Sequence, residues 1–142
     1  MAINYSVRKK VYKSDNEAKE LYYAVPKAVQ KRGRGIDEAH LAKELANRSS
    51  LTSGDVLSVL EQITGKIAEH LKEGRTVNIR GLGTFFIAIT SEGCETREEC
   101  TTDKVRVSRV CFKADKNLST NVKKAKFVSL ELSEEKKNEE NG

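Results

Sequence analysis

A run of about twenty residues that begins at position 52 most constrains the fold, because it predicts one long amphipathic helix. The motif "TSGD" at its start is a capping box, in which the side chains of Thr52 and Asp55 each bond the other residue's backbone amide. Gly74 ends the helix after Lys72. The apolar residues on one face are Val56, Leu57, Leu60, Ile63, Ile67 and Leu71. One short neighbour cannot cover so wide a stripe, so we expect a second subunit to cover the rest.

A shorter helix is predicted just before the long one. Asp37 is placed to cap its N-terminus, and Glu38 lies in its first turn. Ile36 and Leu41 stand at the spacing of a hydrophobic staple. Residues 37–72 therefore predict a helical hairpin.

The stretch "GRTVNIRGLGTFFIAI", residues 74–89, raises two alternatives. A nucleotide-binding loop would need a third glycine and a following helix whose N-terminus faces the phosphates. Here "GLG" is followed by "TFFIAI", which favours a strand, and the stretch contains no "GK[ST]". We therefore predict that Gly81 and Gly83 allow a tight reversal between a strand at 75–80 and a strand at 84–90.

The segment "KVRVSRVCF", residues 104–112, predicts a third strand with imperfect alternation. Strict alternation places Lys104, Arg106 and Ser108 on one face, and Val105, Val107, Arg109 and Cys111 on the other. The mixed second face indicates a bulge or a change of face near Arg109. The segment "DKNLSTNVKKAKF" at 115–127 predicts a short closing helix, so the fold class is α+β.

The N-terminal residues form a basic extension, with nine basic and three acidic residues among residues 1–36. "INYSVRKKVYK" predicts a half-exposed strand, and "LYYAVPKAVQ" a second extended piece in which Pro26 requires an edge or a turn. "KRGRG" at 31–35 predicts a flexible link, so residues 1–35 are treated as a separate extension that is partly strand. Residues 131–142, with five acidic and two basic residues, predict a disordered acidic tail.

The cysteines and histidines argue against several kinds of site. Cys94, Cys100 and Cys111 lack the spacing of a zinc site or a disulfide framework, so plain thiols are expected, with a Cys94–Cys100 bridge as the alternative. His40 and His70 lie far from all three cysteines in the sequence. No carboxylate or histidine pattern fits a metal or an acid–base pair, so we predict no cofactor, no small-molecule substrate and no enzyme.

The overall composition bears on partners and location. No apolar run approaches the ~20 residues that span a bilayer, and the first residues lack the apolar stretch of a secretory signal. We therefore expect a cytoplasmic protein without a membrane partner. The formal net charge of +5 favours an anionic partner.

Two motifs carry a family resemblance. "LKEGRTVNIRGLGTF" at 71–85 combines a helix end, a strand and a G-[FL]-G-[TS]-F bend, and "FKADKNL" at 112–118 precedes the last helix. Together they resemble the HU/IHF family of bacterial histone-like DNA-binding proteins, over roughly residues 36–128. For residues 36–130 the resemblance implies a helical hairpin base, a three-stranded antiparallel sheet and a short C-terminal helix in an intertwined homodimer. It also implies ribbon arms that enter the DNA minor groove and bend the duplex.

The resemblance further implies which side chains contact DNA phosphates. Lys116 matches the phosphate-contacting lysine ahead of the closing helix, Lys113 matches a basic position, and Arg80 lies beside the bend where family members contact the backbone. The alternative at each position is an ordinary solvated side chain. The full set of predicted DNA-binding residues is Arg75, Arg80, Lys104, Arg106, Arg109, Lys113, Lys116 and Lys123.

The sequence departs from the family pattern in the arm. The family arm is basic with a proline wedge, whereas residues 91–104 contain no proline. They carry Glu92, Glu95, Glu98, Glu99 and Asp103 against Arg97 and Lys104. Without an apolar wedge to offset base unstacking, strong kinking by this arm is not expected.

Three functions compete on this basis. The leading one is a nucleoid protein that binds double-stranded DNA largely without sequence preference, to which Arg8, Lys9 and Lys10 of the extension would add phosphate contacts unless they are simply solvated. The alternative is an HU-like dimeric scaffold for protein interactions that has lost strong DNA binding. A helix-turn-helix at 41–56 is disfavoured, because the helix from Thr52 is too long and apolar to read a major groove.

Overall fold

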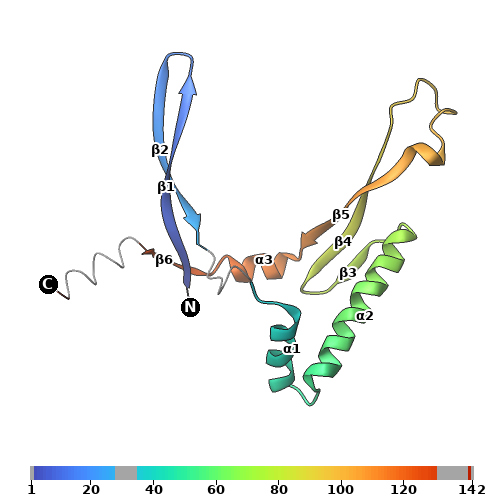
Figure 1. Ribbon diagram of the computed structural model, residues 1–142, viewed down its shortest axis with the longest axis horizontal. Coiled ribbons are helices and arrows are strands. Elements are labelled where there is room, and N and C mark those ends of the chain that lie inside the picture. Colours follow the sequence, from blue (N-terminus) through green and yellow to red (C-terminus); the bar gives the residue numbers. More distant parts are fainter. Residues whose placement is uncertain (1, 28–34, 131–140, 142) are drawn as a thin grey trace. The chain divides into compact units, whose positions relative to one another are not determined.

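The computed structural model describes residues 2–27, 35–130 and 141 (Figure 1). The chain divides into two compact units, one formed by residues 36–122 and the other by residues 1–35 with 123–142. The structural division therefore falls before residue 130, where the sequence placed the end of the HU-like domain.

Two predicted segments lie almost wholly outside the described residues. Of the basic link at 31–35 only Gly35 is described, and of the acidic tail at 131–142 only Asn141.

The two helices of the hairpin begin where the capping signals predict, and α2 ends after Lys72 as expected. In α1 (Glu38–Asn47), Asp37 Oδ1 accepts a hydrogen bond from the His40 amide at 2.9 Å. In α2 (Ser53–Lys72) the capping box is complete: Thr52 Oγ1 accepts from the Asp55 amide at 3.1 Å, and Asp55 Oδ2 from the Thr52 amide at 3.0 Å. The C-terminal end of α2 is closed by Gly74, whose φ of 77° lies in the left-handed region.

The helical hairpin buries little of its apolar surface within one chain. The buried hydrophobic residues of the described chain are Ala42, Val56 and Leu71. Ile63 of the α2 stripe remains 39% exposed, and Val59, which the predicted stripe did not include, is 50% exposed. This stripe accordingly lacks the intrachain cover that a lone globular domain provides.

A three-stranded antiparallel sheet in the order β3-β4-β5 follows the helices. Its strands are β3 (Val77–Ile79), β4 (Gly83–Ser91) and β5 (Val105–Ala114). The predicted reversal is confirmed, because the Leu82 amide bonds the Ile79 carbonyl at 3.0 Å and Gly81 has a φ of 83°. The prediction of a strand over 75–80 is too long at both ends.

The segment after β5 differs most from the sequence expectation. The closing helix predicted over 115–127 is wrong in its second half: α3 spans only Lys116–Val122, and Lys126–Ser129 form strand β6. β6 pairs in parallel with β1 (Ala2–Ser14), which also pairs with β2 (Glu17–Pro26) in a sheet of order β2-β1-β6. As expected, Pro26 ends an edge strand. No helix in the described part of the chain is long and apolar enough to cross a membrane.

Candidate nucleic-acid interface

The β3-β4-β5 sheet has one apolar face and one cationic face. Residues directly opposite each other in the ladder share a face, so the register assigns every side chain of β5. The apolar face carries Val77, Ile79, Phe85, Ile87, Ile89, Val105, Val107, Val110 and Phe112, and the Phe85 and Phe112 ring centroids lie 4.8 Å apart. The cationic face, as we name it, carries Asn78, Thr84, Thr90, Arg106, Arg109, Cys111 and Lys113, together with the apolar Phe86 and Ala88.

A single β-bulge brings the two arginines of β5 to the cationic face. Ala88 pairs with Arg109 and Ile89 with Val107, so Ser108 is an extra residue between two paired positions. Its hydroxyl donates to the Ala88 carbonyl at 3.1 Å. Arg106 and Arg109 are three residues apart and would face opposite ways in a regular strand. The predicted bulge near Arg109 is therefore confirmed, and it places Arg106 together with Arg109 and Lys113.

The apolar face of the sheet lies on the side of α2. Residues of both elements line one shared hollow: Val59, Gln62, Ile63, Lys66, Ile67 and His70 of α2 with Val77 and Ile79 of β3. The cationic face consequently points away from α2. Arg106, Arg109 and Lys113 are all exposed, and none of the three strands contains an acidic residue.

Polar contacts within the cationic face order its side chains. Arg109 Nε donates to Cys111 Sγ at 3.4 Å, which aligns the guanidinium along the strand. Asn78 Nδ2 donates to Thr84 Oγ1 at 2.7 Å, and Thr84 lies opposite Lys113. Sequence reasoning missed Asn78, Thr84 and Thr90, although they are the even-numbered polar positions of two alternating strands.

Two further predicted residues lie at the end of the sheet that holds the bend. Arg80 is exposed in the turn before Gly81, and Lys116 is the exposed first residue of α3. The Asp115 amide donates to the Leu82 carbonyl at 2.9 Å, which fastens the start of α3 to that turn. Asp115 also caps α3, because its Oδ1 accepts from the Asn117 amide at 2.8 Å. Arg80, Lys113 and Lys116 thus cluster at one end of the cationic face.

The remaining predicted residues are not part of this cluster. Arg75 precedes β3, contrary to its expected place in a strand, and its Nε lies 3.4 Å from Glu73 Oε2. Lys104 is half-buried in the short 3₁₀ helix Thr102–Lys104 at the far end of the ribbon. Lys123 follows α3 and groups with the other unit.

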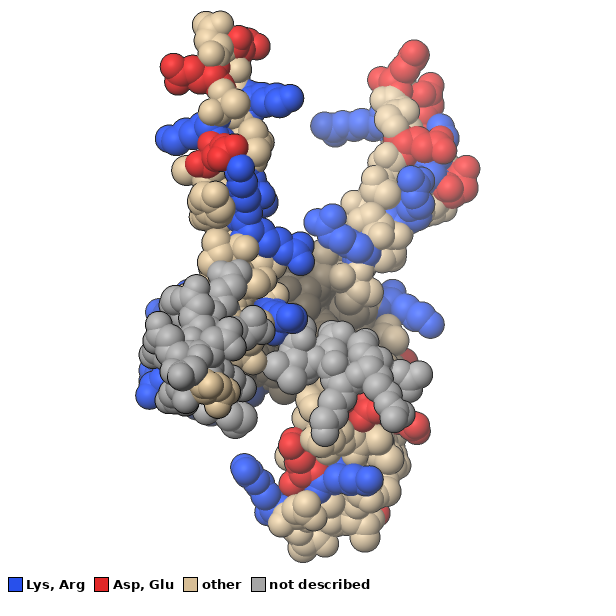
Figure 2. Space-filling view, turned by 60° about the vertical axis from the view of Figure 1, so that its left-hand side comes forward, with Lys and Arg blue, Asp and Glu red and all other residues tan. Residues whose placement is uncertain are grey.

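The far end of the β4–β5 ribbon is acidic. Glu92, Glu95, Glu98, Glu99 and Asp103 are exposed there, and Figure 2 shows acidic side chains gathered at that end with Lys and Arg nearer the base. The Cys94 and Cys100 thiols are free, and desolvation together with a hydrogen bond to Cys100 raises the pKa of Cys94. Among the described residues no group of three or more His, Cys, Asp or Glu could hold a metal ion.

Comparison with known protein families shows which family the chain belongs to. The profile of the HU-HIG family, described as an HU domain fused to a winged helix-turn-helix, an Ig domain or a glycine-rich motif, matches residues 1–129. The chain belongs to the HU-HIG family. The match includes the β1–β2 extension as well as the helical hairpin and its sheet. Among curated proteins none matches the sequence of this chain.

A solved structure shares the fold at low sequence identity. A candidate DNA-binding protein from Bacteroides vulgatus ATCC 8482 is 16% identical with a TM-score of 0.58, over 90% of this chain and 48% of that one. The chain therefore spans about half the length of that relative. Anabaena HU, crystallised with DNA, is 20% identical with a TM-score of 0.47, over 61% of this chain and 97% of that one.

Proposed function

We propose that this HU-HIG protein binds double-stranded DNA largely without sequence preference, through the cationic face and the adjacent Arg80 and Lys116. The observation that carries the proposal is the bulge at Ser108, which gathers three cations on a strand face without carboxylates. Such a row suits the phosphate backbone, which dominates affinity in sequence-independent binding. The Bacteroides vulgatus protein that shares the fold is described as a candidate DNA-binding protein, and the family match is to an HU domain, which supports the same partner.

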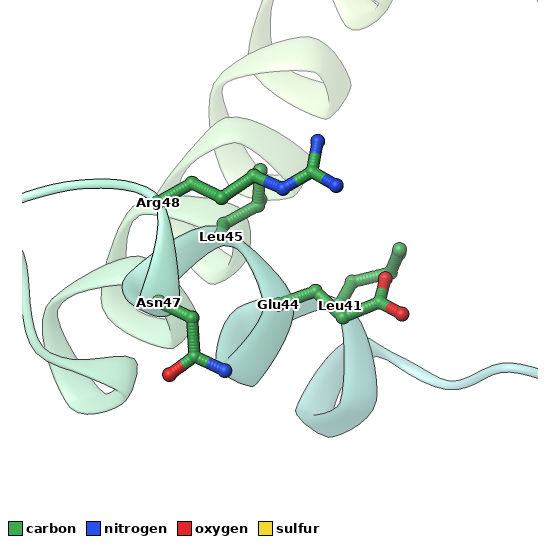
Figure 3. A pocket seen from close by; sticks show the side chains of 5 residues that line it. All are labelled: Leu41, Glu44, Leu45, Asn47 and Arg48. Carbon is green, nitrogen blue, oxygen red and sulfur yellow. The ribbon is translucent and has the colours of Figure 1, made fainter.

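The protein is proposed to act as a dimer. Its α2 stripe is left open, and α1 adds exposed Leu41 and Leu45 (45% and 49% exposed). These two leucines line a shallow pocket together with Glu44, Asn47 and Arg48 (Figure 3). A second copy that covers both helices would supply the missing core, because apolar area of this extent is normally buried. The proposed setting is the bacterial nucleoid in the cytoplasm.

The mass in solution tests the dimer. The chain weighs 15.9 kDa, so light scattering coupled to size exclusion should give twice that mass. Ile63→Asp places a charge in the open stripe and should shift the protein to monomers or aggregates. A stable, fully folded monomer of the unmodified chain would contradict the dimer proposal.

A salt-dependent titration tests DNA binding. Fluorescence anisotropy with a short duplex should give a logarithmic affinity that falls linearly with the logarithm of salt concentration, by ~0.9 for each phosphate contact. Arg106→Gln with Arg109→Gln should reduce this slope by about two contacts. Lys43→Gln with Lys72→Gln removes the same charge from the helices and serves as the control.

The acidic end of the β4–β5 ribbon supports a second candidate function, a dimeric scaffold for protein interactions. Five exposed carboxylates beside two basic residues form a surface that repels phosphates. If the unmodified chain showed no DNA binding at micromolar concentration and low salt, the dimeric scaffold for protein interactions would be the better account.

A further inference from the structure

The β1–β2 hairpin extends beyond its own sheet as an exposed two-stranded ribbon. β6 pairs with β1 only from Ala2 to Tyr5, whereas β2 pairs with β1 as far as Ser14↔Glu17. From Val7 to Ser14 every residue of β1 is exposed. A two-stranded ribbon in water is only marginally stable by itself. Its exposed residues therefore form a surface available to a partner.

The register divides this ribbon into two faces. Arg8 lies opposite Tyr23, Lys10 opposite Leu21, and Tyr12 opposite Lys19. The ribbon's basic face, as we name it, consists of Ser6, Arg8, Lys10, Tyr12 and Ser14 of β1 with Glu17, Lys19, Leu21, Tyr23 and Val25 of β2. The opposite face consists of Val7, Lys9, Val11, Lys13, Ala18, Glu20 and Tyr22.

The charges of the two faces differ in their pairing. On the opposite face Lys9 Nζ lies 2.8 Å from Glu20 Oε1. On the basic face Arg8, Lys10 and Lys19 form no ion pair with any described residue. The basic face thus presents three cations without an ion pair, and its one carboxylate, Glu17, lies at the turn end of the ribbon.

Two tyrosines lie among these cations. Lys10 Nζ is 5.5 Å from the centroid of the Tyr23 ring, and the Tyr12 and Tyr23 rings meet edge to face at 6.3 Å. The two rings therefore meet over the same face, where a hydrogen bond with Tyr12 raises the pKa of Tyr23. The Tyr23 ring therefore orders the Lys10 side chain over the basic face.

We propose that the basic face of the β1–β2 ribbon is a second DNA-binding surface, which contacts the phosphates of duplex DNA. The inference rests on the proposed function of the cationic face, because both surfaces would bind one polyanion. Alternate cations of a strand stand about 6.6 Å apart, and a two-stranded ribbon is narrow enough for the major groove, which is about 12 Å wide. Attachment to a DNA-binding unit also raises the local concentration of DNA around the ribbon.

The first test compares two double variants of the full chain. Arg8→Gln with Lys10→Gln neutralises the basic face, and Lys9→Gln with Lys13→Gln removes the same charge from the same strand on the opposite face. In salt titrations with a short duplex, the first pair should reduce the slope by about two contacts and the second by much less. Equal slopes for the two pairs would overturn the proposal.

The second test uses the unmodified protein and needs no variant to fold. Acetylation of lysine amines, followed by mass spectrometry, should show Lys10 and Lys19 protected by duplex DNA while Lys13 stays reactive. DNA binding with protection of Lys113 but not of Lys10 and Lys19 would overturn the second surface and leave the proposed function standing. No DNA binding at all would overturn both, and would turn attention to an acidic protein as the ribbon's partner.

Discussion

The molecule carries two antiparallel ribbons of similar build and different charge pattern. The β4–β5 ribbon has its cations at the base, and its far end at 92–104 holds five acidic residues against two basic ones. The β1–β2 ribbon has cations along its length, and its turn region at 13–19 is balanced, with two basic and two acidic residues. Phosphate contacts need cations that no carboxylate pairs with. In the proposed account, DNA therefore contacts the base of the β4–β5 ribbon and one face of the β1–β2 ribbon.

The comparison also separates this chain from a simple HU arm. A ribbon that ends in carboxylates without a proline wedge is poorly suited to unstack bases in a minor groove. In our account the sheet binds the backbone, the arm end stays clear of the duplex, and the N-terminal ribbon supplies additional contacts.

The largest expected effect comes from a substitution at Gly83, which should destabilise the β4–β5 ribbon and leave the β1–β2 ribbon intact. A Cβ at Gly83 would meet the Lys113 carbonyl at 2.4 Å and the Phe112 ring at 2.7 Å, with φ at 156°. Gly83→Ala should therefore lower the free energy of unfolding by about 3 kcal/mol, as strain and overpacking do. Circular dichroism during thermal unfolding measures the loss.

Gly74→Ala is the matched control for this change. Gly74 has a φ of 77° but nothing within 4 Å of its added Cβ, so only the backbone conformation is penalised, by about 1 kcal/mol. Equal losses in the two variants would show that the close approach of β4 and β5 at Gly83 is not a constraint on the fold.

The next effect tests the acidic end of the β4–β5 ribbon. Glu95→Gln, Glu98→Gln and Glu99→Gln together should raise DNA affinity several-fold at low salt, because long-range repulsion of the phosphates is removed. The gain should shrink as salt approaches 0.1 M, where the screening length is about 10 Å. Glu38→Gln, Glu44→Gln and Glu61→Gln on the helices are the control, and an equal gain there would refute a local effect.

Deleting Ser108 removes the bulge and should have only a small effect on DNA affinity, which tests the assignment of Arg106 to the cationic face. Without Ser108, β5 alternates regularly, and Arg109 and Val107 still lie opposite Ala88 and Ile89. Arg106 then stays on the cationic face, so DNA affinity should change by no more than about twofold. A loss as large as that of the Arg106→Gln, Arg109→Gln variant would contradict the face assignment.

The smallest expected effect concerns the geometry of the β1–β2 ribbon. Tyr12→Phe removes the hydrogen bond that raises the pKa of Tyr23, so the pKa of Tyr23 should fall toward its ordinary value. A pH titration of the tyrosine ring signals by NMR measures this change. An unchanged Tyr23 pKa would mean that the two hydroxyls do not meet in solution.

Local signals allowed much of the fold to be predicted. The caps at Asp37 and Thr52 and the glycine reversal at 81–83 depend on neighbouring residues, and the structure places them as expected. β6 could not be predicted in the same way, because residues 126–129 become a strand only by pairing with β1 at the other end of the chain. The sequence alone predicted a helix that ends at residue 127.

The candidate site was only partly predictable for the same reason. Arg80, Lys113 and Lys116 follow from the family motifs, and Arg106 and Arg109 from the predicted third strand, but their common face depends on where β4 pairs with β5. The irregular alternation around Arg109 indicated a bulge, and only the ladder identified Ser108 as the extra residue. Likewise Lys19 joins Arg8 and Lys10 only through the register of β1 with β2.

The native cysteines offer the most direct test of the central claim. Cys111 lies on the cationic face beside Arg109, whereas Cys100 is exposed in the acidic end of the same ribbon. Alkylation rates of each thiol, measured by mass spectrometry with and without a short duplex, report which end DNA covers. The account predicts slower alkylation of Cys111 and an unchanged rate at Cys100 when DNA is bound. Protection of Cys100 with no change at Cys111 would contradict it.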